Sequence, residues 1–276
     1  MTGGTATRRA PRPGSPILPG YRVLGRLHRS NVYDVFDVWS EERWARCVAK
    51  TLRPDRDGDR RARAQLLREG RRLREMTHPH IVRAWEVHPG SPPVVVLETL
   101  TGQTLAHLIE TAPRPLAGRE AAMLGLHLVS ALHYLHARGL LHLDLKPSNV
   151  VAEAGRAVLI DLSVSRPPGR IPAGRGTWCY MAPEQARGGE VTAAADVWGV
   201  GVVLFEAVTG EVAFTDTETE TPQLRARAAP VRSLRRVPTP LASLIDACLS
   251  PAAEDRPSLA DLRACLEPVA GVPGLR

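Results

Sequence analysis

The stretch LLHLDLKPSNVV, residues 140–151, decides how the rest of the chain is interpreted. Asp144, Lys146 and Asn149 stand here among leucines and valines, so an acid, a base and an amide fall close together in a mostly apolar segment. Burying such groups is costly unless each one finds a partner. The pattern therefore indicates a functional site rather than plain core. It leaves open whether that site is catalytically active or keeps the residues of an active site without the activity.

The residues that follow, NVVAEAGRAVLIDLS, are predicted to form a β-hairpin. Two short apolar runs flank the turn signal Glu153-Ala154-Gly155. Asn149 begins the first strand and Asp161 ends the second, so strand pairing is expected to bring them side by side. A carboxylate and an amide oxygen make a hard-oxygen site that suits Mg²⁺ together with phosphate.

Upstream, residues 21–50 alternate apolar and polar side chains and are predicted to form three strands. Residues 60–76 change to a helical period that puts Leu66 and Leu73 on one face. Glu69 falls on this inner face, where a carboxylate without a cation partner would be costly. Lys50, at the end of the third predicted strand, is the expected partner.

The remaining chain alternates strand and helix signals without an internal repeat. Residues 94–100 read as a buried strand, and residues 119–138 as a long helix that Gly139 ends. Residues 196–210 are apolar almost all round, which predicts a buried central helix. Further helices are expected near 238–249 and 258–267.

Length and composition favour a soluble, globular protein. A chain of 276 residues can bury a large core as one domain or two lobes, and 43% apolar with 24% charged residues is typical of such proteins. The four cysteines form no CxxC pair, which indicates reduced thiols in a cytoplasmic protein. No stretch reaches the roughly 18 apolar residues of a membrane span. Residues 1–20 lack the apolar segment of a secretory signal and are expected to be a disordered tail.

The net charge of +7 comes from arginines spread over nearly every segment. The densest groups, residues 53–74 and 225–236, are not interleaved with aromatic side chains, so solvated faces are favoured over nucleic-acid binding. Of the 36 basic residues only Lys50 and Lys146 are lysine. A chain that otherwise uses arginine keeps a compact ammonium at two positions, where a planar guanidinium would not serve.

Taken together, these segments resemble a bacterial, actinobacterial-like Ser/Thr protein kinase. The motifs that carry the resemblance, in the expected order, are VAK (48–50), HPHIV (78–82), HLDLKPSN (142–149), DLS (161–163), GTWCYMAPE (176–184), DVWGVG (196–201) and DRPS (255–258). The resemblance implies an α+β, bilobal kinase fold: a small β-rich N-lobe with one key helix, residues 21–100, and a mostly helical C-lobe, residues 101–268. Residues 1–20 and 269–276 would be tails.

The resemblance also implies a role for each matched residue. Lys50, paired with Glu69, would hold the α- and β-phosphates of ATP. Asp144 would accept the proton of the substrate hydroxyl, and Lys146 would neutralise the γ-phosphate. Mg²⁺ would be held by Asn149 and Asp161. The adenine ring would contact the remaining nucleotide-binding residues: Leu27, Val35, Ala49 and Val151 around the ring, Leu97 as gatekeeper, and Glu98 to Leu100 as hinge.

Further matched residues are expected to support the site. Thr177 would bridge Asp144 and Lys146, and Asp196 would anchor the loop that carries them. His142 is expected to order that loop as a core histidine. The other expected brace is a buried ion pair between Glu184 and Arg256.

Three departures bear on activity. The glycine positions of the loop that covers the phosphates hold His28, Ser30 and Tyr33, and glycine there lets the backbone approach phosphate. Leu143 replaces the arginine that would receive a phosphorylated activation loop, so activity is expected not to be switched by phosphorylation of that loop. Ser163 replaces the glycine after the Mg²⁺-binding Asp161.

Two functions therefore stay open. The first is an ATP- and Mg²⁺-dependent kinase that phosphorylates Ser/Thr hydroxyls of a protein. The second is a pseudokinase, a nucleotide-binding or scaffolding module for a regulated partner protein. A small-molecule phosphotransferase is disfavoured by Lys146 and by the APE and DRPS segments. Neither a nucleic-acid nor a membrane partner is expected, and the sequence leaves the oligomeric state and any docking role of residues 225–236 open.

Overall fold

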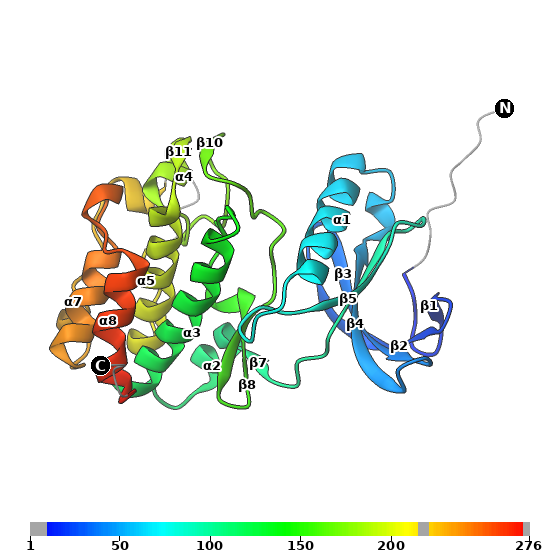
Figure 1. The fold of residues 1–276 in the computed structure, drawn as a ribbon, viewed down its shortest axis with the longest axis horizontal. Coiled ribbons are helices and arrows are strands. Elements are labelled where there is room, and N and C mark those ends of the chain that lie inside the picture. Colours follow the sequence, from blue (N-terminus) through cyan, green and yellow to red (C-terminus); the bar gives the residue numbers. More distant parts are fainter. Residues whose placement is uncertain (1–9, 215–220, 273–276) are drawn as a thin grey trace. The chain divides into compact units, whose positions relative to one another are not determined.

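The computed structural model describes residues 10–214 and 221–272, and these divide into two compact units. Unit 1 comprises Met1–Thr77 with Ile81–Thr101, and unit 2 comprises His78–His80 with Gly102–Arg276. In Figure 1 the sheet-rich unit 1 is blue to cyan, and the mostly helical unit 2 runs on to red. The expected fold, a β-rich lobe with one key helix and a mostly helical lobe, is confirmed.

Unit 1 is built on one antiparallel sheet with the strand order β1-β2-β3-β4-β6-β5. The three strands expected in residues 21–50 are present, and a single long helix, α1, accompanies the sheet. The bounds are β1 Pro16–Leu18, β2 Tyr21–Arg29, β3 Tyr33–Ser40, β4 Ala45–Leu52, β5 Ala84–His88, β6 Val94–Leu97, α1 Arg60–Glu75 and the short 3₁₀ turn η1 Pro54–Arg56.

Strand β1 corrects the expected extent of the N-terminal tail. Pro16 and Leu18 pair with Arg22 and Tyr21 of β2, and Ile17 and Leu18 pack against the core of the sheet. A composition rich in Pro, Gly and Arg predicted disorder up to residue 20, but a few apolar residues are enough to add an edge strand. Residues 1–9 of the expected tail lie outside the described residues.

Helix α1 starts at a side-chain cap and packs through one apolar face. The carboxylate of Asp59 accepts a hydrogen bond from Ala62 N at 2.9 Å, which satisfies a free N–H of the first turn. Leu66, Gly70 and Leu73 are buried, as the helical period predicted. A β-carbon on Gly70 would lie 2.6 Å from Val95 Cγ2 of β6, so the close approach of the helix to the sheet requires glycine.

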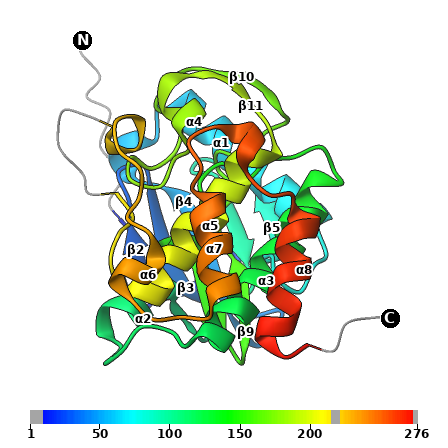
Figure 2. The ribbon, with the colours of Figure 1, turned by 90° about the vertical axis from the view of Figure 1, so that its left-hand side faces the viewer.

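Unit 2 is organised around helix α5, Ala193–Thr209, which is buried along nearly its whole length. It packs against α3 and α7, and α8 packs against α3 and α7 in turn (Figure 2). The helix ends at Gly210, whose φ of 78° is left-handed. The other helices are α2 Leu105–Thr111, α3 Gly118–His136, α4 Pro183–Arg187, α6 Val231–Leu234, α7 Thr239–Cys248 and α8 Leu259–Ala270, with the 3₁₀ turns η2 Pro147–Asn149, η3 Pro222–Leu224 and η4 Ala253–Asp255.

Two small sheets complete unit 2. The first, in the order β7-β8-β9, contains the predicted hairpin, because β8 and β9 pair up to Glu153 and Arg156 across the turn at Ala154 and Gly155. The second joins β10 to β11. The bounds are β7 Gln103–Thr104, β8 Val150–Glu153, β9 Arg156–Leu159, β10 Gly169–Ile171 and β11 Gly189–Val191. Among the residues described, no helix has the length and apolarity to cross a membrane.

Candidate active site

In unit 1 the expected ion pair is present. Lys50 Nζ lies 2.9 Å from each carboxylate oxygen of Glu69, and the two side chains are nearly fully buried. Lys50 comes from β4 and Glu69 from the inner face of α1, so the pair ties the helix to the sheet. An ammonium and a carboxylate that hold each other inside a protein avoid the penalty of an unpaired buried charge.

The expected adenine contact at Ala49 is corrected by the alternation of strand β4. Side chains on a strand point to opposite faces in turn, so Val48 and Lys50 share one face and Ala49 lies on the other. Ala49 is completely buried in a core cluster with Phe36 and Val96, on the face opposite Lys50. Val35, which pairs directly with Lys50, does share the face of the lysine. Val48 therefore replaces Ala49 as the candidate.

The other expected nucleotide residues of unit 1 lie at the ends of strands. Leu27 on β2 is 56% exposed and available to a ligand, whereas Leu97 at the end of β6 is buried. The N–H of Glu98 donates to Arg83 O at 2.9 Å, and its carboxylate accepts from Arg83 N at 2.9 Å. This internal pairing fixes the first residue of the expected hinge and uses up its N–H.

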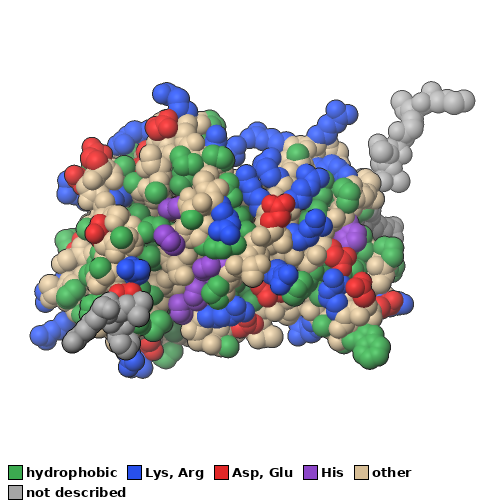
Figure 3. Space-filling view, viewed as in Figure 1, with side chains coloured by type: hydrophobic (Ala, Val, Ile, Leu, Met, Phe, Trp, Pro, Cys, Tyr) green, Lys and Arg blue, Asp and Glu red, His purple; other side chains and the backbone are tan. Residues whose placement is uncertain are grey.

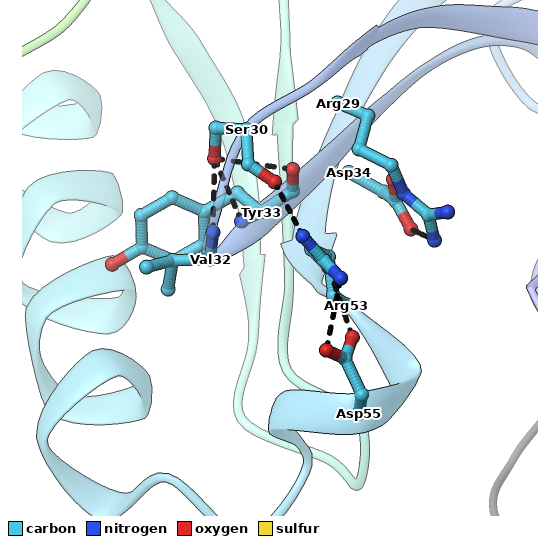
Figure 4. Close-up of polar contacts among 7 residues, drawn as sticks. All are labelled: Arg29, Ser30, Val32, Tyr33, Asp34, Arg53 and Asp55. Atoms are coloured by element: carbon cyan, nitrogen blue, oxygen red, sulfur yellow. Dashed lines mark hydrogen bonds and ion pairs between the residues drawn. The ribbon is translucent and has the colours of Figure 1, made fainter.

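The turn between β2 and β3, where kinases have the glycine-rich loop and this chain was expected to lack the glycines, is closed by side chains (Figure 4). Ser30 N donates to Tyr33 O at 2.9 Å. Ser30 Oγ accepts from Val32 N at 3.2 Å and from Tyr33 N at 2.9 Å. The carbonyl of Ser30 also accepts from Arg53 Nη1 at 3.1 Å. The Ser30 hydroxyl therefore accepts hydrogen bonds from two backbone N–H groups of its own turn, which is a common role of serine in turns.

Two ion pairs lie beside this turn. Arg29 and Asp34 form a two-point pair with distances of 2.8 and 3.1 Å, and Asp34 is completely buried. Arg53 and Asp55 form another, with both distances at 2.9 Å. Figure 4 shows both pairs together with Ser30 and Tyr33. Side-chain hydrogen bonds and ion pairs therefore hold the turn, in place of the free backbone that glycines would give.

Tyr33 links the same turn to helix α1. Its hydroxyl donates to Ala62 O in the first turn of the helix at 3.2 Å, and Lys50 Nζ lies 5.0 Å from the centre of its ring. An ammonium at this distance from an aromatic face is attracted by the ring. Of the three substituted glycine positions, Ser30 and Tyr33 therefore have structural roles, while His28 is exposed and pairs with Val35 across the strands.

In unit 2 the loop that carries Asp144 is anchored as expected by Asp196. The carboxylate of Asp196, on α5, accepts from His142 N at 2.9 Å and from Leu143 N at 2.8 Å. His142 is fully buried, and its Nδ1 accepts from Asp144 N at 3.2 Å, which confirms a core histidine that orders the loop. Leu143 has a φ of 63°, a strained conformation for leucine that this network maintains.

Asp144, Lys146 and Thr177 meet in one hydrogen-bonded cluster. Lys146 Nζ donates to Thr177 Oγ1 at 2.6 Å and lies 3.0 Å from Asp144 Oδ2. Thr177 Oγ1 in turn donates to Asp144 Oδ1 at 2.7 Å. The predicted bridge is confirmed. It holds a carboxylate and an ammonium side by side, both partly open to solvent, in a geometry suited to proton acceptance and charge neutralisation.

Asn149 and Asp161 are neighbours across the hairpin. Ile160 N donates to Asn149 O at 3.1 Å, which places Asp161 one residue beyond the paired position. The amide Nδ2 of Asn149 donates to Asp144 O at 2.9 Å and to Asp144 Oδ2 at 3.1 Å, which leaves its oxygen as an acceptor. Asp161 Oδ1 accepts from Ser163 N at 2.7 Å. An amide oxygen and a carboxylate fit the oxygen preference of Mg²⁺, although no three His, Cys, Asp or Glu side chains in residues 10–214 and 221–272 form a metal cluster.

Gln185 is a functional candidate that the sequence analysis did not identify. The side chain is buried on α4, and its Nε2 donates to Leu143 O and to Arg175 O, each at 2.8 Å. One amide therefore ties the segment before α4 to the loop of Asp144. Its position directly after the APE motif is the only sequence signal that could have marked it.

The remaining expected braces lie away from the Asp144 cluster. Glu184 and Arg256 form a two-point ion pair at 2.7 and 2.9 Å, and the arginine side chain is fully buried. Arg256 also donates to Ala194 O, so the pair connects α4 and α5 to the DRPS segment.

Val151, expected near adenine, is buried on β8 between β7 and β9.

Comparison with known proteins identifies the family of the chain. The profile of the protein kinase domain matches residues 20–266. The chain is 34% identical over 231 residues to the serine/threonine-protein kinase PkaA of Streptomyces coelicolor, which covers 80% of this chain and 42% of that protein. It is 32% identical over 263 residues to the probable serine/threonine-protein kinase PkwA of Thermomonospora curvata, covering 92% of this chain and 35% of that protein.

A third relative is the probable serine/threonine-protein kinase PknB of Lactococcus lactis, 32% identical over 204 residues, which covers 70% of this chain and 32% of that protein. The chain thus spans between about a third and two fifths of the length of these relatives. The profile match covers most of the 276 residues and includes every motif described above. The chain belongs to the protein kinase family.

Proposed function

We propose that this chain phosphorylates serine or threonine hydroxyls of a protein, with ATP as the phosphoryl donor. The observation that carries the proposal is the cluster of Asp144, Lys146 and Thr177, in which a carboxylate and an ammonium are held within hydrogen-bond distance. The three relatives described above are named as serine/threonine-protein kinases or probable serine/threonine-protein kinases, and these names support the same reaction. A cytoplasmic location stays a prediction.

In this reaction Asp144 accepts the proton of the substrate hydroxyl while the hydroxyl oxygen bonds to the γ-phosphorus of ATP. The bond from that phosphorus to the β,γ-bridging oxygen breaks, and ADP leaves with the electron pair. Lys146 offsets the negative charge of the transferred group, and Lys50, oriented by Glu69, holds the α- and β-phosphates. Phosphoryl transfer depends mainly on such positioning and charge neutralisation.

Mg²⁺ is the metal that the candidate ligands suit. Asn149 and Asp161 would hold it, and when bound it would neutralise phosphate charge. The contribution of the chain itself is to orient Asn149, whose Nδ2 is fixed on Asp144 so that its oxygen is presented as a ligand.

We propose that the kinase activity is not controlled by phosphorylation of the activation loop. Ser165 is buried and donates to Leu141 O at 2.6 Å, and the hydroxyl of Thr177 is engaged with Asp144. Tyr180 donates to Glu206 at 2.9 Å, and Gln185 supplies the tie between this segment and the loop of Asp144. Expression with and without a co-expressed phosphatase should therefore give protein of equal specific activity.

The test of the reaction is transfer of labelled γ-phosphate from Mg·ATP to the protein itself and to a generic basic protein substrate. Asp144→Asn, whose fold is checked by circular dichroism, runs beside the wild type. Transfer by the wild type that falls at least about a hundredfold in the variant supports the kinase, because the proton acceptor is lost. Equal background in both, from folded protein, contradicts it.

The second candidate is a pseudokinase, and the closed β2–β3 turn favours it. Ser30 Oγ occupies the N–H groups of Val32 and Tyr33, so these groups are not available to phosphate oxygens. A pseudokinase of this kind would bind nucleotide weakly or not at all and would act through a partner protein. Titration of a fluorescent ATP analogue, with and without Mg²⁺, separates the candidates when it is paired with the transfer assay.

A further inference from the structure

The solvent face of helix α1 is unusually rich in arginine. Seven of the 16 residues in Arg60–Glu75 are arginine, against 34 of 276 in the whole chain, so an even distribution would put about two there. Figure 3 shows the blue basic side chains gathered over this helix in unit 1. The high density of arginine is therefore a property of this helix and does not follow from the composition of the whole chain.

Five of these arginines have no partner among the described residues. No hydrogen bond or ion pair from residues 10–214 or 221–272 reaches their guanidinium groups. All five are exposed, and at 100° per residue they fall within an arc of roughly 140°. They are Arg60, Arg61, Arg68, Arg71 and Arg74, and together they are called the α1 arginine face.

This arrangement works against the stability of the helix. Arg60 and Arg61 stand in the first turn, where the helix dipole disfavours positive charge and where no acidic residue is present. Arg68 and Arg71 are three residues apart and repel each other. Burial and the charge of Arg68 both lower the pKa of the neighbouring Arg72. Helix stability alone would favour glutamates at several of these positions.

We propose that the α1 arginine face is a docking surface for an acidic segment of another polypeptide. Charge complementarity carries the proposal, because carboxylates on a partner would offset repulsion that the chain itself leaves unbalanced. Arginine also binds carboxylates through two parallel hydrogen bonds.

The surroundings of the face favour a polypeptide over other polyanions. The helix has no aromatic residue on which a base could stack, as single-stranded nucleic acids require. Its leucines, Leu66, Leu67 and Leu73, are buried against the sheet, so none is free to insert into a lipid surface. The proposal concerns unit 1 alone and does not depend on phosphoryl transfer.

The test is a fluorescence anisotropy titration of the full chain against a fluorescein-labelled peptide of ten glutamates. The variant Arg68→Glu/Arg71→Glu is compared with Arg227→Glu/Arg236→Glu, which changes the net charge equally at two other exposed arginines. A third variant, Arg68→Gln/Arg71→Gln, removes charge without adding repulsion. Circular dichroism and the melting temperature check that each variant is folded.

The proposal expects the wild type to bind the peptide in a salt-dependent way. The α1 charge reversal should weaken binding by at least about tenfold and the neutral variant by less, because each exposed ion pair contributes at most about 1 kcal/mol. The control pair should stay within about twofold of the wild type. Equal losses in the two reversed pairs would mean nonspecific attraction and would overturn the proposal. Tighter binding of an oligothymidylate or of phosphatidylglycerol vesicles through the same arginines would overturn it as well.

Discussion

Thr177 donates its hydroxyl hydrogen to Asp144 at 2.7 Å, while the same oxygen accepts from Lys146 at 2.6 Å. One threonine thus holds the proposed proton acceptor and the proposed charge neutraliser in register. Thr177→Val keeps the shape of the side chain but removes both hydrogen bonds. The expected result is a fall in kcat of roughly ten- to a hundredfold, because hydrogen bonds to charged groups contribute about 1.5–3 kcal/mol.

Thr177→Ser is the matched control, since it keeps the hydroxyl, and it should retain activity within about threefold. The measurement is kcat and KM for ATP in the transfer assay. A valine variant as active as the serine variant would show that the bridge does not contribute to the reaction.

The buried pair of Lys50 and Glu69 is expected to show strong energetic coupling. Lys50→Met or Glu69→Gln alone leaves one charge buried without its partner, which should cost about 3–5 kcal/mol of unfolding free energy. The double variant should lose less than the sum of the two single variants. Urea unfolding of all four proteins gives the coupling energy.

An exposed pair provides the comparison for this cycle. Arg53 and Asp55 have the same 2.9 Å geometry, but the carboxylate side chain is 52% exposed, so their coupling should not exceed about 1 kcal/mol. Similar coupling in the two cycles would mean that burial does not strengthen the pair of Lys50 and Glu69.

Ser30→Ala is expected to loosen the β2–β3 turn. The change removes the oxygen that accepts from Val32 N and Tyr33 N, at a cost of about 1 kcal/mol. Both N–H groups then become available to phosphate, so KM for ATP should fall while hydrogen exchange at these two amides becomes faster. Hydrogen-exchange mass spectrometry of the peptide that spans the turn, together with ATP kinetics, tests both effects.

Ser91→Ala changes an exposed serine in unit 1 and serves as the control. Unchanged exchange in Ser30→Ala would show that the hydroxyl does not close the turn in solution. A raised KM would show that a rigid turn helps nucleotide binding rather than hindering it.

Stability should fall in mild acid because of two stacked histidines in unit 2. His80 and His127 lie with ring centroids 4.2 Å apart, and His127 Nδ1 accepts from Ala157 N. Burial lowers the pKa of His127 to about 4 and also lowers the pKa of His80. The unfolded chain takes up these protons first, near its ordinary pKa of about 6.5, so the stability contributed by the neutral rings is present above that pH and is lost between about 6.5 and 4.

Melting temperatures measured from pH 7.5 to 4.5 test this prediction. His127→Gln should reduce the dependence on pH, whereas His107→Gln, at an exposed position on α2, should leave it unchanged. Identical pH profiles for the wild type and His127→Gln would show that another group controls the acid transition.

The sequence predicted those parts of the fold in which one pattern determines one structure. The helical period of residues 60–76 puts Glu69 on a buried face, and a buried carboxylate requires a cation, so the pairing with Lys50 follows from the sequence alone. The hairpin around Gly155 brought Asn149 and Asp161 together for a similarly local reason. Other predicted roles rested instead on the resemblance to kinases, namely those of Asp196, Thr177 and the pair of Glu184 and Arg256.

Other features had no such signal. The segment CVAK is apolar on both faces, so its pattern does not show which residue lies beside Lys50, although counting back two residues from the lysine would have selected Val48 rather than Ala49. Gln185 acts through an amide that reaches two backbone carbonyls, and backbone partners cannot be identified from side-chain patterns. The closure of the turn by Ser30 also depends on local backbone geometry.

The two lysines have a practical consequence for chemical labelling. Apart from the α-amino group, Lys50 and Lys146 carry the only primary amines of the chain, Lys50 in the ion pair with Glu69 of unit 1 and Lys146 in the cluster with Asp144 and Thr177 of unit 2. An amine-reactive ester therefore modifies almost nothing else, and mass spectrometry of two peptides reports on the Lys50 pair and the Lys146 cluster separately. Lys50, 7% exposed and paired with Glu69, should react slowly, while Lys146 should be shielded whenever a nucleotide or substrate is bound. Because lysine is so scarce, the extent of acylation at Lys146 reports whether a ligand is bound beside it.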